Sequence, residues 1–413
     1  MVRLSRAQLQ QLNRAKVLAA ARDEFAARGY PGAKVDRIAE RAGLTRGAVY
    51  SNFPGKRALY FAVLAELAES DAESVAEQGV TGREFGSEVI AETGADAGSP
   101  GAADRAARRA ALGAFARAWT ARLPLAGDAV RPAGEGARLD THLMSEVLAD
   151  ERTRQPYGQL LKLDALLLGL ALETLQPADR DRPAERSRLV RVAESVLTSL
   201  HGARQLADAA PGFVEPFTVI HACERLADSA PHDTWNPPHL PYVPHARPVD
   251  EPWPPVPTSG GALHGAAGDA PLDAVRGTPA RLDGDGDGVL VVLGLHRLEA
   301  VEEAVRAAPA GATVTAVLVS GCPNELIPLA RLAVADVVTC LRRSFPAASW
   351  PRLQLVYDAT GSVAAAAGVP AVSDGTEAAV RIVDGRIVAR ADGRGACHAA
   401  ATADLRQPAP APG

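Results

Sequence analysis

Cysteine, methionine and aromatic residues are scarce in this chain. Its 413 residues include four Cys and two Met, and only 4% are Phe, Trp or Tyr. The cysteines lie far apart and form no C-x-x-C pair, which excludes a zinc ribbon or a redox pair of that pattern: Cys223, Cys322, Cys340 and Cys397. No apolar run reaches the ~20 residues that span a membrane, and the N-terminus lacks the apolar core of a signal peptide. We therefore expect a cytoplasmic protein without a membrane partner.

Near the N-terminus, apolar residues recur at helical spacing in short segments. The predicted helices cover 13–28, 35–42 and 46–53, and a fourth begins at Lys56. Gly29 ends the first helix and Gly43 supplies a tight turn after the second. Thr45 can cap the third. Two short helices joined by a glycine-bearing turn predict a helix-turn-helix, whose second helix enters the DNA major groove.

Particular residues of this segment follow a recognisable order. They are Phe25, Gly29, Tyr30, Ile38, Ala39, Ala42, Gly43, Ala48, Tyr50, Phe53 and Lys56. This order resembles the DNA-binding domain of the tetracycline-repressor (TetR) family. The chain departs from the family at Lys34, where a threonine is usual, so the second helix loses a side-chain cap and gains a cation near the DNA phosphates.

Charge is distributed unevenly along the chain. Residues 1–60 hold 12 Lys and Arg against four acids, a net +8. Because the whole chain carries −5, the remainder carries −13, and a basic head on an acidic body indicates a nucleic-acid reader. Phosphate contacts are expected from Lys34, Tyr50 and Lys56, and base contacts from Arg46 and Asn52. The other expected interface residues are Thr45, which caps the recognition helix, and Gly47 and Ala48, which permit close approach.

The pattern stays helical over 56–78, and helices resume at 102–123, 138–151, 156–175, 183–207 and 213–229. This succession resembles the ligand-binding and dimerisation domain of the same family. The resemblance implies that the last two helices form the homodimer interface, with an apolar stripe on 183–207. Larger side chains of the middle helices are candidates for the effector pocket: Phe115, Trp119, Met144, Leu160, Leu161 and Leu167.

The segment 231–287 changes character, with 12 prolines in 57 residues. Such a composition predicts an extended linker. Trp235, Trp253 and Tyr242 indicate that part of it lies against a folded surface. Its end, residues 283–288, imitates a calcium loop, but the position that needs glutamate holds Gly294, so a turn before a strand is the better interpretation. We expect no metal site.

From residue 288 the periodicity changes to buried strands alternating with helices. Strands are predicted over 289–295 and 313–321, helices over 297–308 and 324–345, and a hairpin over 378–393 that turns at Asp384 and Gly385. Strand, helix and strand followed by a hairpin and a terminal helix predict an α/β sandwich.

That order, with the segment D-x-x-G-x-x-A-x-x-x-G-V before the hairpin, resembles the thioredoxin-like domain of flavin-dependent aromatic hydroxylases. The loop after the first strand, residues 294–297, has no cysteine, and Thr376 and Glu377 replace the proline that precedes the hairpin in that fold. Thiol catalysis cannot proceed where no thiol stands. We therefore expect no enzymatic activity, no catalytic residue and no cofactor.

The sequence thus predicts a multidomain chain. An all-α helix-turn-helix domain (1–60) and a helical regulatory domain (61–230) come first, and a Pro-rich linker (231–287), an α/β thioredoxin-like domain (288–400) and a disordered tail (401–413) follow. The function implied is a one-component TetR-family repressor that binds a palindromic DNA operator as a homodimer and is released by a small-molecule effector. The alternative is a thiol-based redox sensor or enzyme that uses the C-terminal domain.

Overall fold

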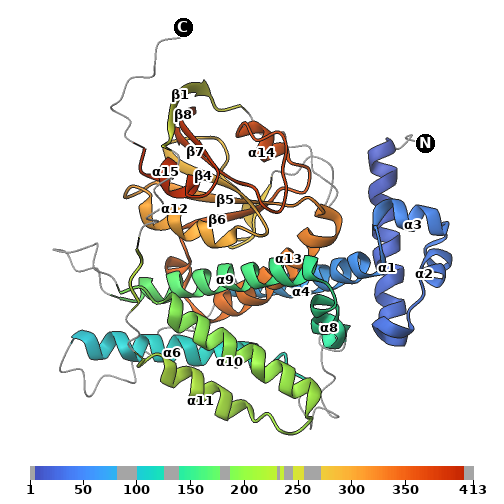
Figure 1. Ribbon diagram of the computed structural model, residues 1–413. Coiled ribbons are helices and arrows are strands. Elements are labelled where there is room, and N and C mark those ends of the chain that lie inside the picture. The colour runs from blue at the N-terminus through green and yellow to red at the C-terminus, as the bar shows by residue number, and fades with distance from the viewer. Residues whose placement is uncertain are drawn as a thin grey trace.

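The computed structural model describes residues 5–80, 100–124, 139–176, 187–229, 233–236, 245–254 and 271–403. A small helical head projects from a body of long helices, and a mixed β-sheet lies against the opposite part of that body (Figure 1). The expected helical N-terminal part followed by a part with a mixed sheet is confirmed.

The head consists of α1 (Arg6–Gly32), α2 (Val35–Ala42) and α3 (Arg46–Asn52), which confirms the predicted helix-turn-helix. Helix α1 begins earlier than predicted because Ser5 and Gln8 form a capping box. Gly29, with φ of 64°, interrupts the helical geometry at the predicted end of the first helix. Gly43 adopts φ of 66° and ends α2 in the left-handed conformation that glycine favours.

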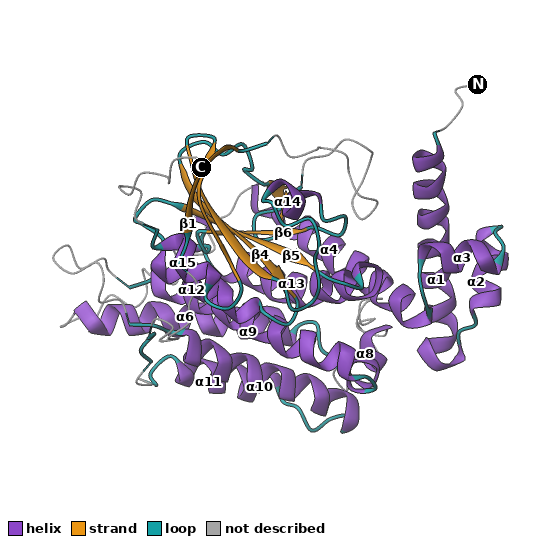
Figure 2. Ribbon diagram, turned by 45° about the horizontal axis from the view of Figure 1, so that its top comes forward, coloured by secondary structure: helices purple, strands orange, loops and turns teal. Residues whose placement is uncertain are grey.

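The body contains five long helices among the described residues. They are α4 (Lys56–Val80), α6 (Pro100–Thr120), α9 (Glu151–Thr174), α10 (Val190–Ala209) and α11 (Pro216–Leu226). A short 3₁₀ turn, η1 (Asp140–His142), and helix α8 (Leu143–Leu148) precede α9. Helix α11 packs on α6 and α10, while α10 packs on α9 (Figure 2).

The main sheet has six strands in the order β1-β8-β7-β4-β5-β6. Strands β4 (Asp287–Gly294), β5 (Thr313–Val319) and β6 (Leu353–Tyr357) run parallel, and β7 (Glu377–Val383) and β8 (Arg386–Asp392) form an antiparallel hairpin beside β4. At its turn Asp384 and Gly385 adopt φ of 46° and 74°, as a two-residue hairpin turn requires.

Part of the expected linker, residues 231–287, forms β-strands. Its residues Arg247–Pro252 form β1, which pairs antiparallel with β8 at the edge of the sheet. Strands β2 (Leu272–Asp273) and β3 (Thr278–Pro279) pair with each other and form a second, two-stranded sheet. Trp253 is buried and its indole donates to the carbonyl of Leu282. The prediction that part of this segment lies against a folded surface is confirmed, whereas Tyr242 lies outside the described residues.

The two faces of the main sheet are covered differently. One face, which includes Leu290, Val317 and Ile382, packs under α14 (Ser362–Ala366) and Trp253 in a small separate core. The other face packs under the turn η3 (Leu298–Ala300) and the helices α12 (Val301–Ala307), α13 (Pro323–Ser344) and α15 (Ala396–Ala401), and its core is continuous with that of the helical body. The turn η4 (Ala347–Ser349) precedes β6 and contacts α9.

Helix α13 is the element that joins the two parts. Every residue from Leu326 to Leu341 is buried, whereas a surface helix buries only one stripe. It lies between the sheet and the body and packs against α4, α6 and α9 (Figure 1). The predicted domains end at 230 and begin again at 288, and α13 packs across these two parts because it contributes to both cores.

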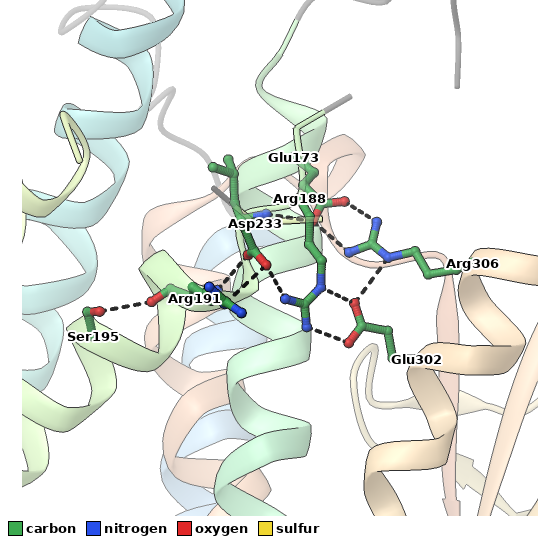
Figure 3. A network of polar contacts seen from close by, with 8 residues as sticks. Glu173, Arg188, Arg191, Ser195, Asp233, Glu302 and Arg306 are labelled. Carbon is green, nitrogen blue, oxygen red and sulfur yellow. Dashed lines mark hydrogen bonds and ion pairs between the residues drawn. The ribbon is translucent and has the colours of Figure 1, made fainter. Parts of the chain in front are cut away.

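Ion pairs cross the same junction (Figure 3). Arg188, just before α10, donates to Asp233 of the connecting segment and, at 2.6 Å, to Glu302 of α12. Arg306 of α12 donates at 2.6 Å to Glu173 of α9 and also bonds Glu302. These partly buried pairs tie four separate stretches of the chain together.

The apolar stripe predicted to form the dimer interface does not face outward. Its members are all at most 7% exposed within the single chain: Leu189, Val192, Val196, Leu197 and Leu200. They fill the core between α10 and its neighbours, so this stripe cannot pack against a second copy. The exposed apolar side chains of this region are Leu206, Phe213 and Phe217, with exposures of 43%, 70% and 71%.

We expect Arg331→Met to destabilise the whole chain. Arg331 is 3% exposed in the middle of α13, and its Nε donates to Glu69 of α4 at 2.7 Å. Removing one partner of a buried pair costs about 3 kcal/mol of unfolding free energy, measurable by urea denaturation. The control Arg154→Met removes the exposed pair with Glu151 and should cost less than about 1 kcal/mol. Equal costs for both variants would contradict the role given to this pair.

Candidate nucleic-acid interface

Helix α3 lies at the outer side of the head (Figure 1), and its residues Arg46, Gly47, Tyr50 and Ser51 are exposed. The Thr45 hydroxyl accepts a hydrogen bond from the backbone N–H of Ala48, so the predicted cap is confirmed. Gly47 is exposed, and a Cβ placed on it would meet only the Thr45 hydroxyl, at 3.9 Å. Ala48 is half-buried beside it. Gly47 and Ala48 therefore add little side-chain bulk at the start of α3, which allows another backbone to approach closely.

Arg46 and Tyr50 lie one turn apart on this surface. The Arg46 guanidinium donates to the Tyr50 hydroxyl at 3.4 Å and lies 3.2 Å from the Asp36 carboxylate of α2. All three side chains are well exposed, so these contacts are weak and can be exchanged for contacts to a ligand at low cost. Hydrogen bonds to Tyr50 and the charge of Asp36 raise the pKa of Arg46, which stays cationic.

Lys34 precedes α2 and Lys56 begins α4, and the two lysines differ in their exposure to solvent. Lys34 is exposed at the start of α2 and makes no capping hydrogen bond, as the sequence predicts. Lys56 is half-buried, its ammonium donates to the carbonyl of Pro31 at 3.3 Å, and it lies 4.5 Å from the centre of the Tyr30 ring. Burial lowers the pKa of Lys56.

Asn52 does not lie where a base contact needs it. Its side chain is 9% exposed and its Nδ2 donates to the carbonyl of Ala48 at 2.8 Å. Arg14 of α1 donates to the Asn52 carbonyl at 3.3 Å and stacks over Phe53. Asn52 thus closes the end of α3 and ties it to α1. The last turn of α3 points this residue inward, whereas the sequence predicts a base contact for it.

The predicted pocket residues divide into two groups. Phe115, Trp119, Leu160 and Leu167 are at most 2% exposed and form part of the packed core. Met144 and Leu161 are half-buried and line a small cavity bounded by η1, α9, α10 and α13. Sequence reasoning missed the polar residues of this cavity, because they come from helices far apart in the chain.

The cysteines give no support to thiol chemistry. Cys223, Cys340 and Cys397 are buried, and burial raises the pKa of each thiol, to about 11 for Cys223 and Cys340. Cys322 is exposed at the start of α13. The loop after β4 holds Arg297, which pairs with the buried Glu377 at 2.7 Å. The loop residue Arg297 is thus engaged in an ion pair, and the alternative of a redox sensor or enzyme is not favoured.

Two kinds of feature are absent from the described residues. Among them, no three His, Cys, Asp or Glu side chains are arranged to hold a metal ion. No described helix is long and apolar enough to cross a membrane.

Comparison with known proteins assigns the head. Residues 17–63 match the family model described as bacterial regulatory proteins, tetR family. The helical head is therefore similar to the corresponding segment of that family. The transcriptional repressor AcnR of Corynebacterium diphtheriae is 42% identical over 69 residues, which cover 17% of this chain and 36% of AcnR. The uncharacterised regulator TtgW of Pseudomonas putida is 50% identical over 52 residues, covering 13% of this chain and 39% of TtgW.

The likeness to these regulators is confined to the head region, since the chain spans only about a third of the length of the relatives it matches. Among solved structures, RolR with the ligand resorcinol aligns with 54% of this chain and 90% of its own, at 19% identity and a TM-score of 0.30. A TetR-family regulator structure from Mesorhizobium loti aligns with 55% of this chain and 96% of its own, at 14% identity and a TM-score of 0.28.

The placement of Asn52 leads to a test. Asn52→Ala removes the hydrogen bond that closes α3 and should cost about 1 kcal/mol of unfolding free energy, seen as a lower melting temperature. Its effect on DNA should be uniform across sequences. A change in base preference, measured by selection from a random DNA pool, would instead show that Asn52 reads a base.

Proposed function

We propose that this chain is a one-component transcriptional repressor of the TetR type that binds a palindromic operator as a homodimer and is released by a small molecule. The observation that carries the proposal is the capped, exposed α3 on a head whose sequence matches the TetR family. Relatives of that head are named as transcriptional repressors. A two-fold dimer presents two copies of α3 and so requires a two-fold site.

The DNA contacts follow from the geometry of the head. Arg46 stands at the exposed start of α3, where a guanidinium can make two hydrogen bonds to a guanine edge. Tyr50, one turn further, is placed for a phosphate, as is Lys34 at the start of α2. Lys56 binds a phosphate from a fixed position in this proposal, because its ammonium already contacts the carbonyl of Pro31 and the ring of Tyr30.

The dimer interface of this proposal is the outer face of α10 and α11. The inward face of α10 is consumed by the monomer core, whereas Phe213 and Phe217 expose large rings at the start of α11. Ser195, Ser199 and Gly202 give α10 a narrow outer profile. Exposed aromatic rings beside a narrow helix suit close packing against a second copy.

The C-terminal part is included in this proposal as a non-catalytic thioredoxin-like domain. Its core strands occur in the order β5-β4-β7-β8, with two parallel strands followed by an antiparallel hairpin. It acts through α13, which packs along α4, the helix that leads from the head into the body. Arg57 of α4 donates to Glu325 of α13 at 2.5 Å. A shift of α13 would therefore move the head.

Operator binding is tested by a gel-shift titration with DNA that flanks the gene of this protein. Tyr50→Phe and Lys56→Ala should weaken binding to all sequences, and Lys56→Ala should lower the slope of log K against log salt by about 1. Arg46→Ala should lower discrimination at one base pair by ~1–3 kcal/mol. Arg154→Ala, at an exposed arginine of α9 that pairs with the exposed Glu151, is the control. Wild-type binding by all three variants would refute the assignment of α3.

The interface is tested by sedimentation. Phe213→Asp with Phe217→Asp places two charges in the proposed contact and should convert the dimer to a monomer that binds operator far more weakly. Leu148→Asp, an equally drastic change at a residue of α8 that is 59% exposed, should leave the dimer intact. A dimer that survives the double substitution places the interface elsewhere.

A further inference from the structure

A small acidic cavity lies where the helical body meets α13. Its walls come from η1, α8, α9 and α10 of the body and from Leu329, Leu332, Ala333 and Asp336 of α13. Its enclosed space is about 20 Å³, enough for one water molecule or one ammonium group. The half-buried Met144 and Leu161 and the exposed Thr141 and Gln205 line the side that leads to solvent.

Two buried polar atoms in this cavity have no hydrogen-bond partner within the described chain. They are Oδ1 of Asp164 on α9 and Nε2 of His201 on α10. Asp164 is 1% exposed, and the His201 ring lies against Trp119 with ring centres 4.9 Å apart. A buried polar atom without a partner is costly and rare in folded proteins, so an unpaired carboxyl beside a cavity points to a ligand.

The cations near the cavity are already engaged. Arg204 of α10 bonds Asp140 of η1 and, at 3.2 Å, Asp336 of α13. Arg122 also bonds Asp336 from behind the cavity wall. The neighbouring arginines therefore satisfy Asp140 and Asp336 and leave Asp164 without a positive partner.

The remaining titratable groups of the wall do not supply one. Burial lowers the pKa of His201, which keeps its imidazole neutral, and raises the pKa of Tyr157, which keeps its phenol protonated. Asp208 at the end of α10 adds a further carboxyl, and burial raises its pKa. Burial and the nearby Asp336 raise the pKa of Asp164, which favours the uncharged form of this carboxyl while the cavity has no cation.

We propose that this cavity binds the ammonium group of a small primary alkyl amine, with Asp164 and His201 as acceptors of its hydrogen bonds. The carboxylate of Asp164 faces the positive charge, and neutral His201 accepts through Nε2. The alkyl chain extends past Met144, Leu161 and Leu329 toward solvent, and the flexible Met144 side chain adapts to its length. On binding, the Asp164 carboxyl releases its proton to solvent while the ammonium keeps its three protons.

The position of the site gives binding a consequence. Asp336, which holds one wall, belongs to α13, and α13 packs along α4 below the head. A bound amine would change the net charge around Asp336. This change would shift the position of α13 against the helical body. The binding itself is independent of the proposed function, whereas its effect on DNA rests on that function.

Binding is tested by isothermal titration of the full chain with n-butylammonium chloride at pH 7. Butan-1-ol, which lacks the charge, and tetramethylammonium, which lacks N–H donors, are the chemical controls, and both should bind at least tenfold more weakly. Titration in two buffers of different ionisation enthalpy should show release of about one proton per amine bound. No heat from butylammonium up to 10 mM would overturn the proposal, as would equal binding of butan-1-ol.

Variants identify the residues. Asp164→Asn keeps the shape and removes the charge, so it should weaken butylammonium binding at least tenfold and abolish proton release. Because Asp164 is unpaired in the free protein, this variant should melt at or above the wild-type temperature, which separates loss of binding from loss of folding. Glu194→Gln, at an exposed acid of α10 outside the cavity, should bind as wild type. Unchanged binding by Asp164→Asn would overturn the assignment.

A gel-shift assay with the operator then tests the consequence. Butylammonium should change operator affinity of the wild-type chain and leave that of Asp164→Asn unchanged. If the amine binds and operator affinity does not change, the site stands and its role as effector site falls. If no DNA binds at all, the proposed function fails while the calorimetric result remains.

Discussion

The burial of α13 between the sheet and the helical body is the constraint on which the rest of the structure depends. A helix buried around its circumference must place each polar side chain opposite a partner, because an unpaired buried charge is costly. Glu325 meets Arg57, Arg331 meets Glu69, and Asp336 meets Arg122 and Arg204. Those partners come from three different parts of the body, so the pairs set the position of α13 along and around its axis.

This arrangement gives the α/β part of the chain a structural role beside the helical body. Its arginines and acids form ion pairs within this part and with the helical body. Arg297 pairs with Glu377 of β7. Arg306 of α12 pairs with Glu173 of α9, and Glu302 of α12 pairs with Arg188 before α10 (Figure 3). Its buried thiols are kept protonated by burial. Helix α13 also packs against α4, α6 and α9 of the helical body.

Local sequence patterns predicted the helices and turns of the head correctly. A helix-turn-helix is specified by short-range signals, such as Gly43 in the left-handed turn and Thr45 as a cap, and these act wherever the chain is placed. The hairpin at Asp384 and Gly385 was predictable for the same reason. The exception was Asn52, since a polar residue at the end of a short helix can face outward or close the helix, and only the packing of Arg14 and Phe53 decides.

The sequence by itself determined most of the helices and the central strands, the basic head and the absence of a paired cysteine motif, but not the strands β1, β2 and β3. The tertiary structure alone decided that α13 lies in the body, that the apolar stripe of α10 faces inward, and that Asp164 and His201 share a cavity. Periodicity reports that a face is buried but not what covers it, because an apolar stripe is the same for an internal core and for an interface. Contacts between residues more than a hundred positions apart leave no mark in local spacing, so a site built from η1, α9, α10 and α13 appears only when the chain is folded.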